Sequence, residues 1–157
     1  MRGRRLALTV HIAVSIGWLG AAVAVLAMAA IGLASDDQRT VRAVYLVMEP
    51  TAWVALVPLA IVSLATGVVS SLLSVWGLLR HWWVVFKLLI TVFATVILLM
   101  YMATFRAMAE LAADPSVELD LVRNPSPLLH GLIAIAALLV ATVLSVYKPR
   151  GLTPAGG

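Results

Sequence analysis

Four long apolar stretches alternate with short polar segments along this chain. The stretches run over about residues 6–33, 51–75, 82–105 and 128–146. Roughly 20 apolar residues in a helix cross the hydrocarbon core of a bilayer, so each stretch predicts one membrane span. Residues 1–148 are therefore expected to form a single all-α domain, an antiparallel four-helix transmembrane bundle, with a short cytoplasmic tail over residues 149–157.

Composition supports a membrane location. The 157 residues are 63% hydrophobic and 11% charged, whereas soluble domains are about 45–50% apolar and about 25% charged. The lipid bilayer is thus the expected partner of this apolar surface. The chain has no cysteine, which excludes disulfides and thiolate metal sites. Its net charge of +4 lies at the ends of the apolar stretches, where it suits anionic lipid head groups better than nucleic acid.

Acidic and basic residues occupy different segments. The N-terminus, the second connection and the C-terminus carry bases without acids: Arg2, Arg4, Arg5, Arg80, Lys87, Lys148 and Arg150. The first and third connections carry every acid: Asp36, Asp37, Glu49, Glu110, Asp114, Glu118 and Asp120. Because basic segments stay on the cytoplasmic side, we expect both termini in the cytoplasm.

The connections give more local signals. Ser35–Gln38 has the form of a helix capping box, which predicts a helix that begins near Asp36 and runs into the second span. That helix is expected to bend at Pro50 or Pro58, because proline removes a backbone hydrogen bond. The third helix is expected to continue beyond the membrane to Ala113.

Small residues recur at helical spacing in the second and fourth spans. They are Ser63, Gly67, Ser70 and Ser74 in the second span and Ala134, Ala137, Ala141 and Ser145 in the fourth. Such faces let transmembrane helices approach closely, so they predict helix-helix seams. A cluster of Trp76, Trp82 and Trp83 around the second connection is typical of an aromatic belt at the membrane surface.

Polar side chains inside the spans are the candidates for function. His11, Ser15 and Trp18 follow one another at i, i+4 and i+7, so they share one face of the first helix. Lys87 lies at a matching depth in the third span, roughly 7–8 Å below the same interface. An ionisable group in a span costs about 2.5 kcal/mol or more, so each is a functional candidate, and the two are expected to face one polar pocket.

The pocket suggests a haem site. Imidazole is a common haem-iron ligand, so His11 is the candidate axial ligand of a haem b, with Lys87 or Arg80 holding a propionate. His81 is the candidate second ligand. Simpler readings stay open: a packing hydrogen bond for His11, snorkelling for Lys87, and an interfacial position for His81 and His130.

A copper site is a further alternative. Apart from Met1, every methionine lies in the outer half with His130: Met28, Met48, Met100, Met102 and Met108. Thioethers bind Cu(I), although methionine also fills irregular gaps in cores. Met100 and Met102 are two residues apart and are expected to point to different faces.

Three segments carry a family resemblance. His11–Gly20, Leu64–Gly67 and Trp76–Leu88 resemble a family of predicted four-span bacterial integral-membrane proteins of unknown function. The likeness covers about residues 6–105. It implies the four-span fold and a bacterial cytoplasmic membrane.

A more distant likeness concerns cofactors. His11 followed by Trp18-Leu19-Gly20 is similar to the first span of haem-containing four-helix protoporphyrinogen oxidases and of copper-resistance membrane proteins of the CopD type. The oxidases also carry a tryptophan and a lysine in span three, here Trp83 and Lys87. This resemblance implies His11 as haem ligand and Lys87 as a pocket residue. The acid-poor interior and the long outer loop depart from that pattern.

The sequence therefore favours a small membrane protein that binds haem b for electron transfer, haem handling or a redox step. One alternative is a cofactor-free scaffold or accessory subunit, whose small-residue faces bind a second copy or another membrane protein. The other alternative is a copper-handling protein. Whether the protein is an enzyme stays open.

Overall fold

The computed structural model describes residues 2–156, all of them helical or in short connections without a named strand. The helices are α1 (Arg2–Ala34), α2 (Gln38–Thr51), the π-helical turn η1 (Ala52–Leu56), α3 (Val57–Leu72), α4 (Trp82–Ala113), α5 (Leu119–Val122), α6 (Ser126–Tyr147) and the 3-10 turn η2 (Pro154–Gly156). Four helical segments are long and apolar enough to cross a membrane: Arg2–Ala34, Gln38–Leu72, Trp82–Ala113 and Leu119–Tyr147. The prediction of an all-helical structure with four helices long and apolar enough to span a membrane is thus confirmed.

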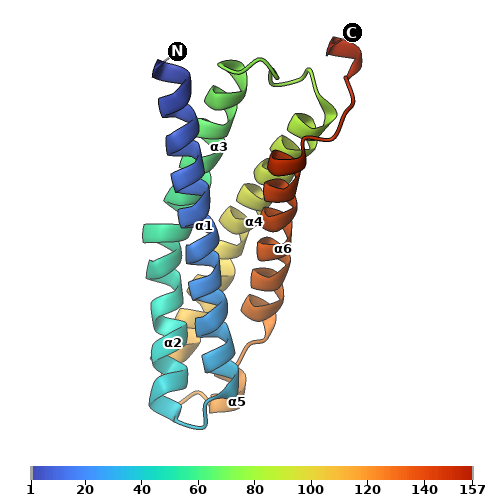
Figure 1. Ribbon diagram of the computed structural model, residues 1–157. Coiled ribbons are helices and arrows are strands. Elements are labelled where there is room, and N and C mark those ends of the chain that lie inside the picture. Colours follow the sequence, from blue (N-terminus) through green and yellow to red (C-terminus); the bar gives the residue numbers. More distant parts are fainter. Residues whose placement is uncertain (1, 157) are drawn as a thin grey trace.

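The four segments form a bundle whose neighbours run in opposite directions (Figure 1). α1 packs against α2, α3 and α6, while α4 packs against α2, α3 and α6. Both chain termini lie at one end of the bundle, which we call the termini end. The opposite end, which contains α5, is the loop end.

The second span starts later than its capping signal predicts. The N-cap residue is Asp37 and not Ser35, the first residue of the capping-box pattern. The carboxylate of Asp37 accepts hydrogen bonds from the amides of Arg39 and Thr40. The span then stays continuous past Pro50 and widens into η1 before Pro58. Proline removes one backbone hydrogen bond of a helix, and a π-turn is one way in which the helix accommodates that loss. The irregularity expected from the prolines is therefore the π-turn between Pro50 and Pro58.

The loop end is densely packed. Tyr45, Met48, Val41, Val122 and Pro127 are its fully buried large side chains. The hydroxyl of Tyr45 both donates to the carbonyl of Asn124 (3.1 Å) and accepts from its amide (2.9 Å). These contacts fasten the connection before α6 to α2.

Arg42 adds a second fastening at the loop end. Its guanidinium donates to three backbone carbonyls, one in the last turn of α4 and two in the connection that follows: Ala112 (3.3 Å), Asp114 (2.7 Å) and Val117 (2.5 Å). Arg123 donates in the same way to the carbonyl of Ser35 (2.7 Å). The two arginines therefore tie all loop-end connections into one unit.

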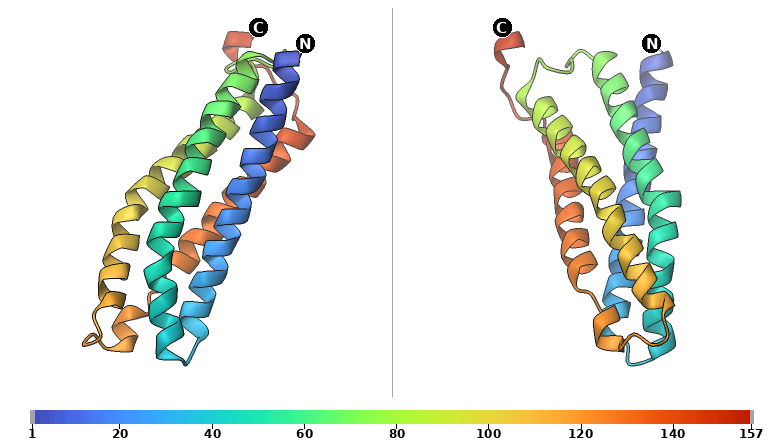
Figure 2. Two further views of the ribbon diagram at one scale, coloured as in Figure 1. Left: turned by 90° about the vertical axis from the view of Figure 1, so that its left-hand side faces the viewer. Right: turned by 180° about the vertical axis from the view of Figure 1, so that it is seen from behind.

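The termini end is more open. The α1–α3 pair and the α4–α6 pair diverge toward this end (Figures 1 and 2). The connection from α3 to α4 crosses this separation, and the tail after α6 lies along its α4 end. The amide of Thr153 donates to the carbonyl of Arg80 (3.1 Å), and the amide of Trp82 donates to the carbonyl of Gly151 (3.3 Å). The hydroxyl of Thr153 also donates to the carbonyl of Leu79. The tail thus holds the α3–α4 turn in place.

Candidate functional site

A cavity of about 750 Å³ lies among α1, α3, α4 and α6 in the half of the bundle nearest the termini end. Its size falls in the range of roughly 300–1,000 Å³ that is usual for small-molecule and cofactor sites. His11, Ser15 and Trp18 from α1 and Lys87 from α4 all line it. The expected meeting of His11 and Lys87 at one pocket is therefore what the structure shows.

A ladder of polar contacts joins α1 to α3 beside the cavity. The Nδ1 atom of His11 lies 3.2 Å from the Thr66 hydroxyl oxygen, and the hydroxyls of Ser15 and Ser63 are 2.9 Å apart. Ser63 is almost fully buried. The ladder fixes the rotation of α1, so that the face predicted from the i, i+4, i+7 spacing turns inward.

The ladder favours one tautomer of His11. A threonine hydroxyl has one proton to give, and the Thr66 hydroxyl lies 2.7 Å from the carbonyl of Val62 and 3.2 Å from that of Ser63. When it donates to either carbonyl, its oxygen accepts from His11 and the ring proton resides on Nδ1. In that tautomer the Nε2 atom keeps its lone pair.

Gly67 makes room for this imidazole. A Cβ atom at position 67 would lie 3.0 Å from Cε1 of His11, closer than most real contacts allow. Glycine is thus the residue that lets the His11 ring lie flat against α3. Gly20, on the same helix as His11, has no atom within 4 Å of an added Cβ.

The charged groups of the wall are all cationic. Arg4, Lys87 and Lys148 line the cavity, and no acidic residue does among those described. Lys148 ends α6 with a left-handed backbone (φ 44°), and its ammonium lies 5.4 Å from the centre of the Trp76 ring. Lys87 has no ion pair or side-chain hydrogen bond within residues 2–156. The cavity therefore suits a ligand that carries negative charge.

Two buried polar atoms of the wall have no partner. They are the hydroxyl of Ser70 and the indole nitrogen of Trp83, and Trp83 itself is only 8% exposed. A buried polar atom without a hydrogen bond costs about 1–3 kcal/mol. Both atoms are covered by neighbouring protein atoms and have almost no exposed surface.

The small-residue face of the second span has two roles. Ser63 and Gly67 form the expected close contact with α1, against Ser15 and His11, and all four residues Ser63, Gly67, Ser70 and Ser74 line the cavity. The α1–α3 contact continues toward the loop end, where a Cβ on Gly17 would meet Leu59 at 3.4 Å. Because the helices diverge toward the termini end, the small side chains of α3 leave space for the cavity.

The aromatic cluster also divides. Trp82 is 46% exposed, as an aromatic belt predicts. Trp76 and Trp83 instead line the cavity, edge to face with ring centres 5.7 Å apart. Trp76 and Trp83 are therefore also walls of the cavity, and their place in an aromatic belt stays a prediction.

The structure does not bring His81 or Arg80 to the cavity wall. His81 lies at the N-cap position of α4, where its Nδ1 is 2.7 Å from the carbonyl of Trp76. Arg80 pairs through its carbonyl with the tail. Arg4 and Lys148 line the cavity instead, although the sequence did not single them out as site residues. The only signal for them was that they are basic residues near the two ends of the chain.

Three of the candidate copper ligands, Met48, Met102 and Met108, belong to one buried cluster, and Met28 packs against it. Met48, Met102 and Met108 are buried in the core, whereas Met100 is 73% exposed, so Met100 and Met102 do face different ways. The ring of His130 lies 4.4 Å from that of Tyr101, and its Nδ1 is 2.9 Å from the Ser126 carbonyl. Residues 2–156 hold no group of three His, Asp or Glu side chains placed to bind a metal.

No family model, curated protein or solved structure matches this chain. The family likeness of the sequence therefore stays a prediction, and the functional argument rests on the cavity.

Proposed function

We propose that this protein binds haem b in the cavity among α1, α3, α4 and α6, as a multi-pass protein of the bacterial cytoplasmic membrane. One observation carries the proposal. The hydrogen bond from His11 to Thr66 leaves the Nε2 lone pair of His11 free on a cavity wall. Metal-bound histidines almost always donate their other ring N–H in this way, which fixes the tautomer and raises basicity.

The residues present fit a haem. The volume, the tryptophan walls and the excess of cations suit a flat, apolar ring with two propionates. Arg4 and Lys148 lie nearest the termini end, so they would hold propionates close to the water, and Lys87 would add a deeper cation. When bound, the haem would supply the iron for redox or ligand chemistry.

The number of imidazoles bears on the role. His11 is the single histidine on the wall within residues 2–156. Electron transfer with two histidine ligands would need a second one, and the carbonyl contact of His81 keeps that side chain elsewhere. A single ligand favours haem handling, or a redox step at an open iron position, over simple electron transfer.

The orientation proposed here follows from charge. The termini end carries Arg2, Arg4, Arg5, Arg80, Lys148 and Arg150, and the loop end carries acids. Both termini would then be cytoplasmic, and the cavity would lie in the inner half of the membrane.

A scaffold function has less support. Its expected surface on the second span, the Ser63–Ser74 face, lines the interior cavity. The alternative of copper handling also has less support, because Met48, Met102 and Met108 pack inside the hydrophobic core and His130 contacts the Ser126 carbonyl.

An absorption spectrum of the detergent-purified protein tests the proposal. We expect a Soret band after expression with haem precursor, or after hemin addition, that shifts on reduction by dithionite. His11→Ala should abolish it, whereas the matched control His81→Ala should keep it. A colourless wild type after hemin addition, or a band unchanged in His11→Ala, would sink the haem hypothesis.

A further inference from the structure

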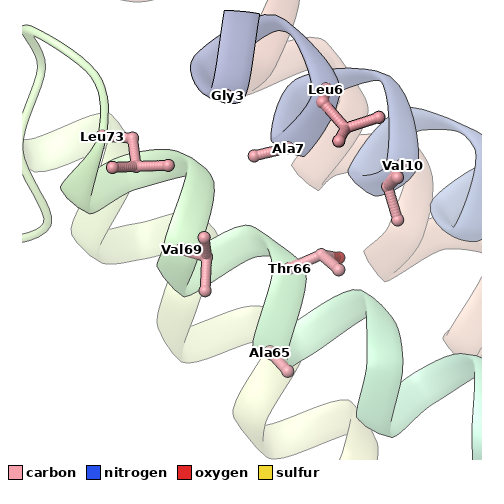
Figure 3. Close-up of a pocket in the computed structure, with 8 residues that line it drawn as sticks. All are labelled: Gly3, Leu6, Ala7, Val10, Ala65, Thr66, Val69 and Leu73. Atoms are coloured by element: carbon pink, nitrogen blue, oxygen red, sulfur yellow. The ribbon is translucent and has the colours of Figure 1, made fainter.

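The helices pack loosely near the termini end. The cavity lies among α1, α3, α4 and α6 there, and a second, shallow hollow of about 390 Å³ lies between the first turns of α1 and the end of α3 (Figure 3). A helix beside such a cavity has fewer packing contacts to fix its position. The α3–α4 turn, residues 73–81, therefore depends on contacts from outside the two helices that it joins.

The tail after α6 supplies these contacts. Thr153 is buried, whereas residues 150–152 and Pro154 are exposed. The Thr153 hydroxyl donates to the carbonyl of Leu79, and its amide donates to that of Arg80. The first amides of a helix have no partner inside the helix, and the carbonyl of Gly151 accepts from one of them, the amide of Trp82. The tail thus holds the turn and also satisfies the start of α4.

Trp76 is the cavity-wall residue that these contacts reach. Its carbonyl lies 2.7 Å from Nδ1 of His81, and the two rings meet edge to face with their centres 5.1 Å apart. His81 in turn pairs with Leu152 of the tail in an antiparallel bridge. The ammonium of Lys148 lies 5.4 Å from the centre of the Trp76 ring, within the range of a cation–π contact. Both ends of the tail segment 148–153 therefore act on this wall.

The backbone of Lys148 supports a role for its side chain. Its φ of 44° lies in the left-handed region, directly after α6. Glycine is the usual residue in this conformation at the end of a helix, because a side chain is strained there. The contact of the ammonium with Trp76 gives a physical reason for a lysine at this position.

We propose that residues 148–153 form a strap that holds the Trp76 wall of the cavity, and that release of this strap lets a ligand pass at the termini end. The inference rests on the proposed role of the cavity as a ligand site, but not on haem as its ligand. Thr153 and Lys148 are positioning residues of the strap, because Thr153 acts through the turn and Lys148 acts through Trp76.

Thiol labelling tests the strap, since the chain has no cysteine of its own. Ser70 lines the cavity, yet its hydroxyl oxygen has almost no exposed surface, so a Ser70→Cys thiol should react when the wall opens. Thr153→Val removes one donor and keeps the side-chain shape. In detergent, we expect it to speed the reaction with a charged methanethiosulfonate by about five-fold, the effect of one lost hydrogen bond. Lys148→Gln should act likewise, whereas Lys148→Arg should keep the wild-type rate.

Two controls separate opening of the wall from general loosening. Arg150→Gln changes an exposed strap residue and should leave the Ser70→Cys rate unchanged. Val41→Cys places a thiol in the fully buried core of the loop end, and the strap variants should not change its rate. Unchanged Ser70→Cys rates in Thr153→Val and Lys148→Gln would overturn the strap. Equal acceleration at both thiols would overturn it too, because the variants would then only destabilise the whole bundle.

Hemin release separates the strap from the haem proposal. If the protein binds hemin, Thr153→Val should transfer it to apomyoglobin about five-fold faster than the wild type does. Faster thiol labelling without faster hemin release would overturn the role of the strap in ligand passage. If the wild type binds no hemin, the haem proposal fails, and the thiol rates still decide whether the strap holds the wall.

Discussion

His11 and Thr66 meet across the α1–α3 boundary, with the imidazole Nδ1 3.2 Å from the hydroxyl oxygen and that hydroxyl 2.7 Å from the carbonyl of Val62. This contact would set which ring nitrogen of His11 carries the proton. Everything proposed for the cavity depends on that proton position.

Replacing Thr66 tests the contact directly. Thr66→Val keeps the shape of the side chain and removes the acceptor, so the proton of His11 is no longer held on Nδ1. We expect hemin affinity to fall by about 10–100-fold, the usual effect of losing such a partner. Thr66→Ser should restore it. Equal hemin titrations for the valine variant and the wild type would contradict the tautomer argument.

Gly67 offers a steric test of the same ring. In Gly67→Ala the new methyl group would lie 3.0 Å from Cε1 of His11, so the imidazole must shift by a few tenths of an ångström. We expect weaker hemin binding by about ten-fold. Gly20→Ala, where an added Cβ meets nothing within 4 Å, is the matched control. Alanine is more favourable than glycine in a helix interior by up to about 1 kcal/mol, so neither variant is expected to lose helix stability. A loss of hemin affinity in Gly67→Ala and not in Gly20→Ala would therefore come from the displaced imidazole.

The single imidazole of the wall predicts a spectroscopic state. The ferric protein with haem should be high-spin, and imidazole added to the solution should convert it to low-spin by occupying the open position. Electron paramagnetic resonance measures the change, and His81→Ala should behave as the wild type. A low-spin wild type without added imidazole would mean that a second protein ligand binds the iron.

Asp37 predicts how stability depends on pH. The hydroxyl and amide of Thr40 and the amide of Arg39 hold the pKa of the Asp37 carboxyl below its ordinary value of 3.8. Because the folded pKa is the lower one, this contribution is present above the unfolded pKa and is lost as pH falls through the folded pKa. In detergent, Asp37→Ala should lower the Tm at pH 6 and show a weaker acid dependence below about pH 4.

Asp36→Ala is the control for this prediction, because the Asp36 carboxylate accepts no hydrogen bond from residues 2–156. A similar loss of Tm in both variants at pH 6 would point to net charge in place of helix capping.

Arg42 predicts a large cost at the loop end. Arg42→Met keeps the apolar stem and removes the donors to three carbonyls. We expect the free energy of unfolding in detergent to fall by about 3 kcal/mol, since bonds to charged groups contribute about 1.5–3 kcal/mol each and do not add fully. Arg106→Met, which breaks only the exposed pair with Glu110, should cost less than about 1 kcal/mol.

Much of this arrangement follows from patterns in the sequence. Apolar length predicts the four spans, and the i, i+4, i+7 spacing predicts that His11, Ser15 and Trp18 share a face. Depth along the helices predicts the level at which Lys87 meets them. These features are local, because they depend on residues within one helix.

The remainder depends on contacts between distant segments. The spacing of the Ser63–Ser74 face is the same in a helix-helix seam and on a cavity wall. The divergence of the helices determines where the face contacts α1 and where it borders the cavity. Likewise, the hydrogen bond between Thr153 and Arg80 joins backbone atoms, so the identity of neither side chain predicts it. The roles of Arg4 and Lys148 depend on where the ends of α1 and α6 lie, which is a property of the whole bundle.

The arginine ties and packed side chains of the loop end have one more consequence. A molecule that reaches His11 finds no way onward through the bundle, since Tyr45, Met48 and the connections around Arg42 fill the far half. A ligand bound as proposed would therefore enter and leave on the termini side of the packed loop end. Under that proposal the cavity would hold a molecule and return it to the side from which it came, in contrast to a channel that passes through the whole bundle.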